Sequence, residues 1–222
     1  AFDSCRNLIS VNLPDGLTSI GPTAFYQCYN LTSITLPDEV KLIQGGTFSY
    51  SSSLTSVYLG RKVTSINSRA FYHCSNLINI SIPDSVREIG NSAFENCHTL
   101  ANIHMGKNVA SIGSNAFSSC SKLASISLPN SLETIESNTF KECSLLANVL
   151  IPEGVKIIGY LSFASCISLT KIDIPSSVNY ISSAFLGCVN LVSINVNDTN
   201  QNYSSIDGVL YSKNPIDLIQ YP

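Results

Sequence analysis

The stretch IGSNAFSSCSKLASISLP, residues 112–129, decides the fold because its apolar residues recur along the chain at a fixed distance. Its Phe117 belongs to a series whose first eight members are each 23 residues apart and whose ninth follows after 22. Self-similarity at a fixed period of this size is the signature of a repeat architecture. We therefore predict a repeat solenoid of about nine 23-residue coils, aligned on Phe2, Phe25, Phe48, Phe71, Phe94, Phe117, Phe140, Phe163 and Phe185.

Three aliphatic positions follow each phenylalanine in the pattern Leu-x-x-Ile-x-Leu. In the quoted stretch they are Leu123, Ile126 and Leu128. From the isoleucine onward apolar and variable residues alternate, as in a short strand that buries one face. Two further aliphatic columns, which include Leu132 and Ile135, indicate a second short extended segment on the opposite wall. We expect the coils to stack with parallel strands and to bury these columns in one continuous core.

The residues between the extended segments predict how each coil bends. Six of eight full repeats place a proline after the first segment, and Gly60 and Gly106 stand there in the other two. Both residue types turn the chain where a ladder hydrogen bond is not needed. The motif Ala-Phe-x-x-Cys predicts one helical turn per coil. Glycine follows the second segment in four repeats, where we predict a turn with positive φ, at Gly21, Gly90, Gly113 and Gly159.

The last part of the chain breaks the period and predicts a C-terminal cap. We assign residues 1–196 to the solenoid and residues 197–222 to the cap. Two apolar runs, 206–211 and 216–221, flank the turn formers at 212–215, which indicates a β-hairpin. Such a cap would cover the core and strand edges that the open end of a solenoid exposes.

Segments such as Leu31–Pro37 and Ile112–Cys120 resemble the BspA-like (Treponema pallidum type) leucine-rich-repeat family. The resemblance covers the repeats from Ala1 to Val196, and Asn202–Tyr211 is similar to the usual ending of that family. It implies a leucine-rich-repeat fold and an extracellular or cell-surface location. It also implies a protein of a bacterium or a parasitic protist that adheres to host proteins or to other cells.

Departures from the repeat are few. Ser51 stands where the other repeats have cysteine, and Ser162 replaces alanine or threonine before a phenylalanine. One residue is missing between Ile181 and Ala184, and we expect a local twist of the stack there.

Composition and charge narrow the class of protein. Hydrophobic residues make up 44% of the chain and charged residues 12%, which is typical of a folded chain and not of a disordered one. The formal charge of −3 is spread without runs, so neither nucleic acid nor an anionic membrane is indicated as a partner. No apolar stretch approaches the roughly 20 residues of a membrane-spanning helix, so we expect no membrane insertion by this segment. No signal peptide is visible, but no cap precedes the first repeat, so we expect the chain to begin inside a longer protein.

The eight cysteines share one position of the repeat, beside the aromatic column. A free cysteine behaves there as a small buried hydrophobe. Stacked neighbours could reach the Cα separation of a disulfide, but in-register Cβ vectors run parallel and would strain the bridge, so we favour free thiols. No Cys-x-x-Cys or Cys/His pair has ligand spacing, and we expect neither a metal nor another cofactor. The cysteines are Cys5, Cys28, Cys74, Cys97, Cys120, Cys143, Cys166 and Cys188.

The sequence shows no arrangement of residues suited to catalysis. His73 and His98 flank cysteines in the turn, and His104 lies on a strand. None has a carboxylate at the same level that would orient it as a base. Nothing marks the neighbouring thiols of Cys74 and Cys97 as exposed or activated. We predict a protein that is not an enzyme.

The outward positions of the first strand vary in size and charge while the coil around them stays constant. Repeat proteins usually bind along such a face, although scattered surface aromatics are equally compatible with a neutral surface. Most of these residues are small and polar. The exceptions are our candidate ligand-binding residues, Tyr58, His104, Leu150, Lys171 and Asp173.

Two functional interpretations stay open. The favoured one is a cell-surface or secreted adhesion module that recognises a protein or glycan through the strand face of the solenoid. The alternative is a passive spacer or stalk that holds another domain away from the cell. The residues assign neither the partner nor the oligomeric state.

Overall fold

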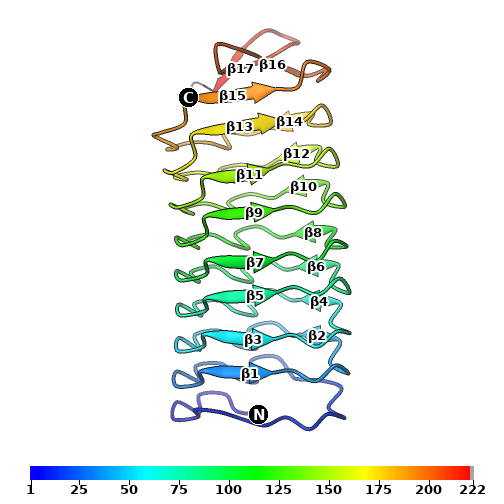
Figure 1. Ribbon diagram of the computed structural model, residues 1–222, viewed down its shortest axis with the longest axis vertical. Coiled ribbons are helices and arrows are strands. Elements are labelled where there is room, and N and C mark those ends of the chain that lie inside the picture. The colour runs from blue at the N-terminus through cyan, green and yellow to red at the C-terminus, as the bar shows by residue number, and fades with distance from the viewer. Residues whose placement is uncertain (221–222) are drawn as a thin grey trace.

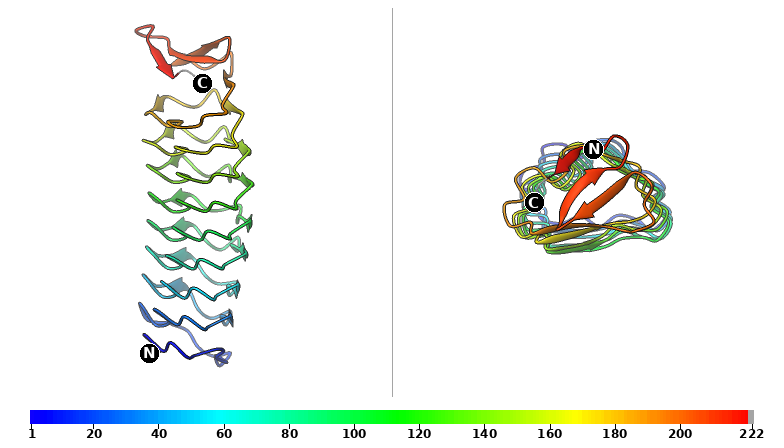
Figure 2. Two further views of the ribbon diagram at one scale, coloured as in Figure 1. Left: turned by 90° about the vertical axis from the view of Figure 1, so that its left-hand side faces the viewer. Right: turned by 90° about the horizontal axis from the view of Figure 1, so that it is seen from above.

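The chain winds into one column of stacked coils, and its two ends lie at opposite ends of that column (Figure 1). This arrangement is seen in a computed structural model, which describes residues 1–220. Viewed along the column, the coils superimpose into one outline, and the last strands lie across it (Figure 2). The predicted solenoid is confirmed. Three walls surround its core, and we name them the strand wall, the second wall and the turn wall.

The strand wall consists of the strands that the Leu-x-x-Ile-x-Leu pattern predicts. They pair in parallel, so Ser33 lies opposite Ser56 and Asn79 lies opposite Asn102, each residue facing its equivalent one repeat later. The central residue of each strand points inward, and the residues on either side of it point outward. The strands are β1 (Ser33–Thr35), β3 (Ser56–Tyr58), β5 (Asn79–Ser81), β7 (Asn102–His104), β9 (Ser125–Ser127), β11 (Asn148–Leu150), β13 (Lys171–Ile174) and β15 (Ser193–Val196).

The second wall is formed by two-residue strands that also pair in parallel. Each places its isoleucine in the core and the preceding residue toward solvent. These strands coincide with the second extended segment that the sequence predicts. They are β2 (Leu42–Ile43), β4 (Ser65–Ile66), β6 (Glu88–Ile89), β8 (Ser111–Ile112), β10 (Thr134–Ile135), β12 (Ile157–Ile158) and β14 (Tyr180–Ile181).

The phenylalanine column forms a stacked aromatic ladder through the core. Neighbouring ring centroids are 5.1 Å apart at the Phe71–Phe94 step and 5.7 Å apart at the Phe117–Phe140 step. All members are buried except Phe2, which has a neighbour on one side only and is partly buried. The last two steps of the ladder turn by 16° and 15°, compared with 3° at each of the two steps before them. Ring angles of 11° and 10° also occur at the Phe2–Phe25 and Phe48–Phe71 steps, so the local twist that we expect near the missing residue stays a prediction.

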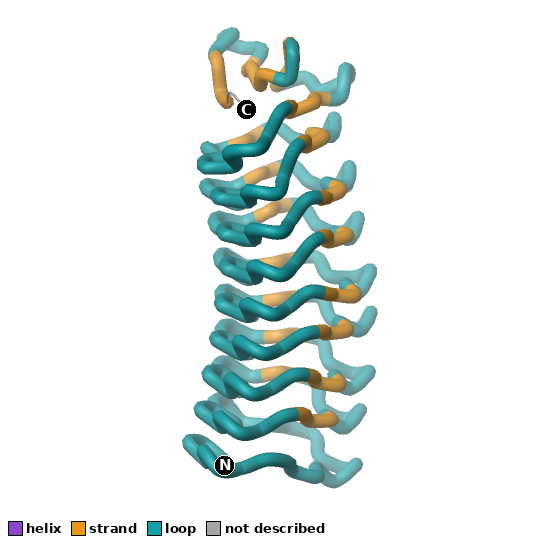
Figure 3. Tube along the Cα trace, turned by 60° about the vertical axis from the view of Figure 1, so that its left-hand side comes forward, coloured by secondary structure: helices purple, strands orange, loops and turns teal. Residues whose placement is uncertain are grey.

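The turn wall consists of the turns that carry the phenylalanines. It contains no helix in the part of the chain that the structure describes, so the predicted helical turn is wrong (Figure 3). Left-handed residues lie two positions before and two positions after each phenylalanine. Around Phe94 they are Ser92, with φ of 56°, and Asn96, with φ of 62°. A helix cannot continue through them. Instead, the Phe94 N–H donates to the Ala116 carbonyl of the next coil at 2.8 Å. Equivalent backbone hydrogen bonds at the other phenylalanines except the last form a ladder along the column, which we name the turn ladder.

The glycines after the second strand do not have the positive φ that we predicted. The glycines in the left-handed region are Gly46, Gly187 and Gly208 instead. Close packing between coils explains Gly90, because a Cβ atom there would lie 2.5 Å from the Ser68 nitrogen. A Cβ at Gly113 would lie 2.3 Å from the Asn91 side-chain oxygen. Glycine is used at these two positions because it lets the backbones of adjacent coils approach each other, and not because it permits a positive φ.

The cysteine column contains free thiols that hydrogen-bond to the backbone. The Cys97 thiol donates to the Phe71 carbonyl at 3.2 Å, and the Cys120 thiol donates to the Phe94 carbonyl at 3.2 Å. Ser51, the departure from this column, donates to the Phe25 carbonyl at 2.7 Å. Each buried member of the column, Ser51 included, thus donates a hydrogen bond to a carbonyl of the preceding coil as well as filling a small space.

Reaction with a thiol reagent is expected to separate Cys5 from the other cysteines. Cys5 is exposed, and the other seven are buried. Burial raises the pKa of Cys143 to about 12, so its reactive thiolate is scarce at pH 8. Ellman's reagent should therefore modify about one thiol in the native protein and close to all eight in the denatured, unreduced protein. A low count after denaturation would reveal disulfides, and rapid reaction of several native thiols would contradict the burial.

The C-terminal strands form a small antiparallel sheet, in the order β16 (Tyr203–Ile206), β17 (Val209–Ser212) and β18 (Leu218–Gln220). The run 206–211 that we predicted as one strand is divided by a tight turn at Asp207 and Gly208, with φ of 50° and 80°. β17 and β18 pair across the turn predicted at 212–215. Tyr221, the end of the second predicted run, lies outside the described residues.

Asn200 joins this sheet to the solenoid. Its buried side-chain amide donates to the Pro175 and Val178 carbonyls at 2.9 Å each. Its side-chain oxygen accepts the N–H groups of Asn202 and Tyr203 at 2.8 Å each. The amide therefore uses two donors and two acceptor positions at once, which matches the full capacity of this side chain.

Candidate functional site

The strand wall presents a flat, hydrogen-bonded surface of polar side chains. Asn102 donates to the Asn79 side-chain oxygen at 2.8 Å, and Asn195 donates to Asp173 at 2.8 Å. These bonds join equivalent positions on neighbouring coils. They limit the freedom of the outward side chains before any partner arrives, which reduces the entropy that binding would cost.

Three of the five candidate residues lie together near the C-terminal end of this wall. Leu150 lies on β11, and Lys171 and Asp173 lie on the next strand, β13. All three line one hollow of about 340 Å³. Leu150 and Asp173 also line a second hollow of about 300 Å³, which extends to Asn195. The Leu150 side chain is 70% exposed and borders both hollows. The first hollow carries Lys171 and Asp173 on its rim, and the second carries Glu153 and Asp173.

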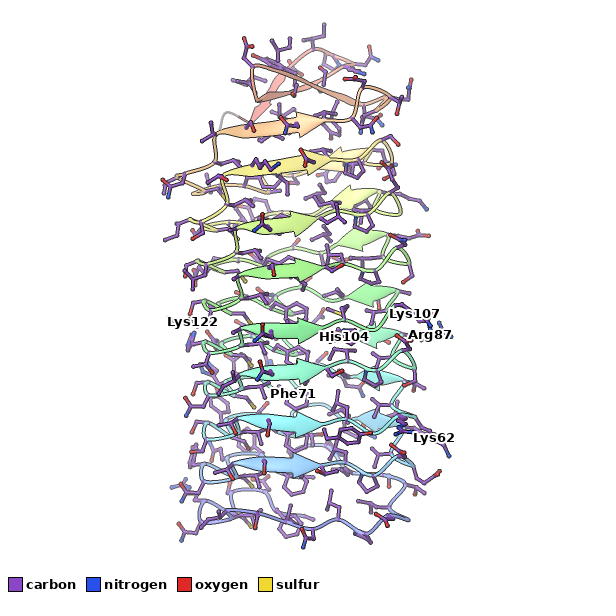
Figure 4. All side chains as sticks on the ribbon, viewed as in Figure 1. Lys62, Phe71, Arg87, His104, Lys107 and Lys122 are labelled. Carbon is purple, nitrogen blue, oxygen red and sulfur yellow. The ribbon has the colours of Figure 1, made fainter. Side chains whose placement is uncertain are left out.

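Tyr58 and His104 lie on the same wall but are separate from this group. Tyr58 is exposed on β3 and lies close enough to Arg61 to raise the pKa of that guanidinium. His104 lies two coils further along, on β7, where Figure 4 labels it. At the usual strand spacing of about 4.8 Å, five coils separate Tyr58 from Asp173 by roughly 24 Å. A single small ligand cannot contact all five residues, although an extended partner can.

The second wall carries a larger hollow. Our site prediction rests on the outward residues of the strand wall, and these give no information about the second wall. The hollow has a volume of about 530 Å³, and its rim includes Glu88, Glu133 and Glu136. The small residues Ala110 and Ser111 at its centre leave the space open. Lys156 forms an ion pair with Glu133 at 2.9 Å. The hollow is therefore acidic, and part of its charge is already neutralised.

The turn wall carries an aromatic group that our reading of the sequence missed. Tyr26, Tyr50 and Tyr72 surround a hollow beside the phenylalanine ladder. The recurrence of tyrosine one or two residues after a phenylalanine is the signal that could have indicated it.

The structure separates the histidines from the neighbouring thiols. Cys74 and Cys97 are buried, and burial raises the pKa of each thiol. His98 contacts the Ser119 carbonyl at 3.0 Å instead of a thiol. Within residues 1–220, no group of three His, Cys, Asp or Glu side chains could hold a metal ion. That same part of the chain has no helix long and apolar enough to cross a membrane.

Comparison with solved structures places this column among bacterial repeat proteins. A leucine-rich repeat protein from Bacteroides ovatus is 30% identical, with a TM-score of 0.78, over 89% of this chain and 57% of its own. The Treponema pallidum leucine-rich repeat protein is 31% identical, with a TM-score of 0.67, over 70% of this chain and 74% of its own. A leucine-rich repeat protein from Eubacterium ventriosum is 25% identical, with a TM-score of 0.68, over 79% of this chain and 57% of its own.

The chain thus spans just over half the length of the Bacteroides ovatus and Eubacterium ventriosum chains. No curated protein matches it. The model of the BspA type leucine-rich repeat region, in 6 copies, matches residues 1–101 and 87–215. Solenoids of this kind are typically non-catalytic binding scaffolds, and no enzymatic family is indicated. Because the match extends over nearly all of the repeats that form the column, this chain belongs to the BspA type leucine-rich repeat family.

Proposed function

We propose that this protein is an adhesion module at the cell surface or outside the cell, and that it recognises a protein partner through its strand wall. The exposed Leu150 ridge, which shares a hollow with Lys171 and Asp173 of the next strand, is the observation that supports this proposal most directly. The family resemblance supports the location. Repeats of this type generally mediate protein binding, which favours a protein over a glycan on this wall.

The ridge has the chemistry of a protein contact. Burying a leucine side chain fully contributes about 1.5–3 kcal/mol. The hollows on either side of Leu150 provide concave surface that partner side chains can fill. Lys171 and Asp173 would select a partner with complementary charges at the rim of the contact. Tyr58 and His104 would extend the contact along the column if the partner is elongated.

A triple alanine variant of Leu150, Lys171 and Asp173 is expected to weaken partner binding at least about tenfold. Its thermal stability should stay nearly unchanged, because all three side chains lie outside the core. The measurement is binding of the purified chain to an array of host extracellular-matrix and plasma proteins. Titration of each positive protein against wild type and variant then gives the affinities.

The matched control replaces Lys41, Arg87 and Glu88 on the second wall with alanine. These residues are exposed, and replacing them likewise removes charges of both signs. Arg61 is unsuitable as a control because it interacts with Tyr58. If the control loses binding and the strand-wall variant keeps it, the partner binds to the second wall. If neither variant affects any interaction, the passive spacer becomes the better interpretation.

A further inference from the structure

The aromatic hollow on the turn wall is a binding site that the strand wall does not explain. Its volume is about 400 Å³. It exists because three small residues interrupt the columns of the turn wall: Ser49 stands in the column of Tyr26 and Tyr72, and Gly45 and Gly46 precede it. The lining residues that concern a ligand are Tyr26, Ser49, Tyr50, Ser68, Arg69 and Tyr72.

The tyrosine rings around the hollow are held in fixed positions. The Tyr50 ring lies 5.7 Å from Tyr26 and 5.4 Å from Tyr72, at 82° to each. His73 stacks on Tyr50 with centroids 4.9 Å apart and an angle of 8°. All four rings are half-buried, so part of each ring still faces solvent. The hollow therefore presents aromatic surface that does not need to rearrange before a ligand binds.

Arg69 is the charged residue in this lining, and it has not been neutralised. No carboxylate lies within ion-pair distance of its guanidinium in the described part of the chain. The guanidinium lies 5.7 Å from the Tyr72 ring centroid, which orients it beside the hollow. Burial, aided by His98 and partly opposed by Glu95, lowers the pKa of His73, which disfavours a second positive charge there.

We propose that this hollow binds an acidic sugar unit of a glycan, such as a uronic or sialic acid. A sugar ring has an apolar C–H face that packs on an aromatic ring, and hydroxyl groups that can bond to tyrosine and serine. Its carboxylate would pair with the Arg69 fork in the bidentate geometry that guanidinium favours. A quaternary ammonium ligand also prefers tyrosine rings, but Arg69 would repel it. The site lies on a different wall from Leu150 and does not depend on the partner proposed there.

Nuclear magnetic resonance titration of the isotope-labelled chain tests this assignment. The probes are methyl glucuronide, methyl sialoside and methyl glucoside, of which the glucoside lacks the carboxylate. We expect at least one acidic sugar to shift the amide signals of Gly46, Ser49 and Ser68. The glucoside should bind about fivefold more weakly, because it loses the charge-assisted hydrogen bonds.

Two variants locate the site. Arg69→Met should remove the preference for the acidic sugar and leave glucoside binding unchanged. Gly46→Asn should abolish binding of both, because the new side chain fills the hollow. Asparagine is compatible with the backbone there, since Asn115 and Asn138 adopt the same left-handed conformation at equivalent positions.

Lys122→Met is the matched control, since it removes one exposed positive charge that lines none of the hollows described above. It should leave sugar binding unchanged. The titration uses no protein partner, so failure of the protein-binding proposal and failure of this one can be distinguished. Equal affinity for glucuronide and glucoside, or no shift with any sugar, would overturn the proposal. The proposal would also be overturned if N-acetylglutamate amide, which has a carboxylate but no sugar ring, shifted the same signals as strongly. The hollow would then recognise a carboxylate alone.

Discussion

Replacing Phe94 with alanine is expected to lower the free energy of unfolding by roughly 3–5 kcal/mol. Phe94 is fully buried and stacks on Phe71 at 5.1 Å and on Phe117 at 5.3 Å. The coils above and below cannot close the cavity easily, because strand pairing on two walls and the turn ladder fix their spacing. Removing the ring therefore leaves space that the neighbouring side chains fill poorly, which is the costly case for a large-to-small substitution.

Urea unfolding followed by circular dichroism measures this loss, with two matched variants. Phe94→Leu keeps most of the volume and is expected to cost less than half as much. Glu95→Ala changes the next residue, which is half-buried on the turn wall, and should shift stability by only a few tenths of a kcal/mol. A loss below about 1 kcal/mol for Phe94→Ala would show that the aromatic ladder is not the main support of the core.

Asn200→Asp is expected to destabilise the protein by about 3–5 kcal/mol, since it buries a charge and loses both hydrogen bonds that the Asn200 amide donates. The aspartate would direct a second oxygen at the Pro175 and Val178 carbonyls, which now accept hydrogen bonds from the Asn200 amide. Three acceptors would then meet with no donor among them. The contact between the C-terminal sheet and the last coils should open first.

Hydrogen exchange can detect this local opening. We expect faster exchange of the Tyr203 amide, which now donates to the Asn200 side-chain oxygen, than of the Phe94 amide in the middle of the column. The control is Asn202→Asp, two residues away, because the Asn202 side chain is exposed. If both variants behave alike, Asn200 does not have the joining role that its hydrogen bonds indicate.

The apolar columns could be predicted because each of them has one structural use. A leucine or isoleucine that recurs every 23 residues is buried only when the coils stack, and the structure buries them in this way. The turn conformation could not be predicted in the same manner. Its left-handed positions include Arg69, Glu142 and Leu161, residue types that rarely adopt this region, so composition gives no warning. The Arg69 and Glu142 N–H groups donate to the Asn91 and Ala164 carbonyls of the next coil, and a single repeat does not contain those bonds.

The candidate sites show a similar limit. Alternation along the strands predicted which residues face outward, including Leu150, Lys171 and Asp173. Hollows arise where small residues in adjacent coils coincide, as Gly46 and Ser49 do beside Tyr72. The shape of several coils together decides which outward residues share a hollow. The sequence pattern of a single repeat does not contain that information.

The turn ladder gives the column a direction. From Phe2 N–H to the Ala24 carbonyl, and onward to Phe163 N–H and the Ala184 carbonyl, every rung points from one coil to the next in the same direction. Two such columns could continue this ladder only head to tail, because a face of donors requires a face of acceptors. Insertion or deletion of one whole 23-residue unit preserves every rung, whereas a partial unit breaks the register. Duplication or deletion of whole units in the gene can therefore lengthen or shorten this architecture in discrete steps without changing its interior.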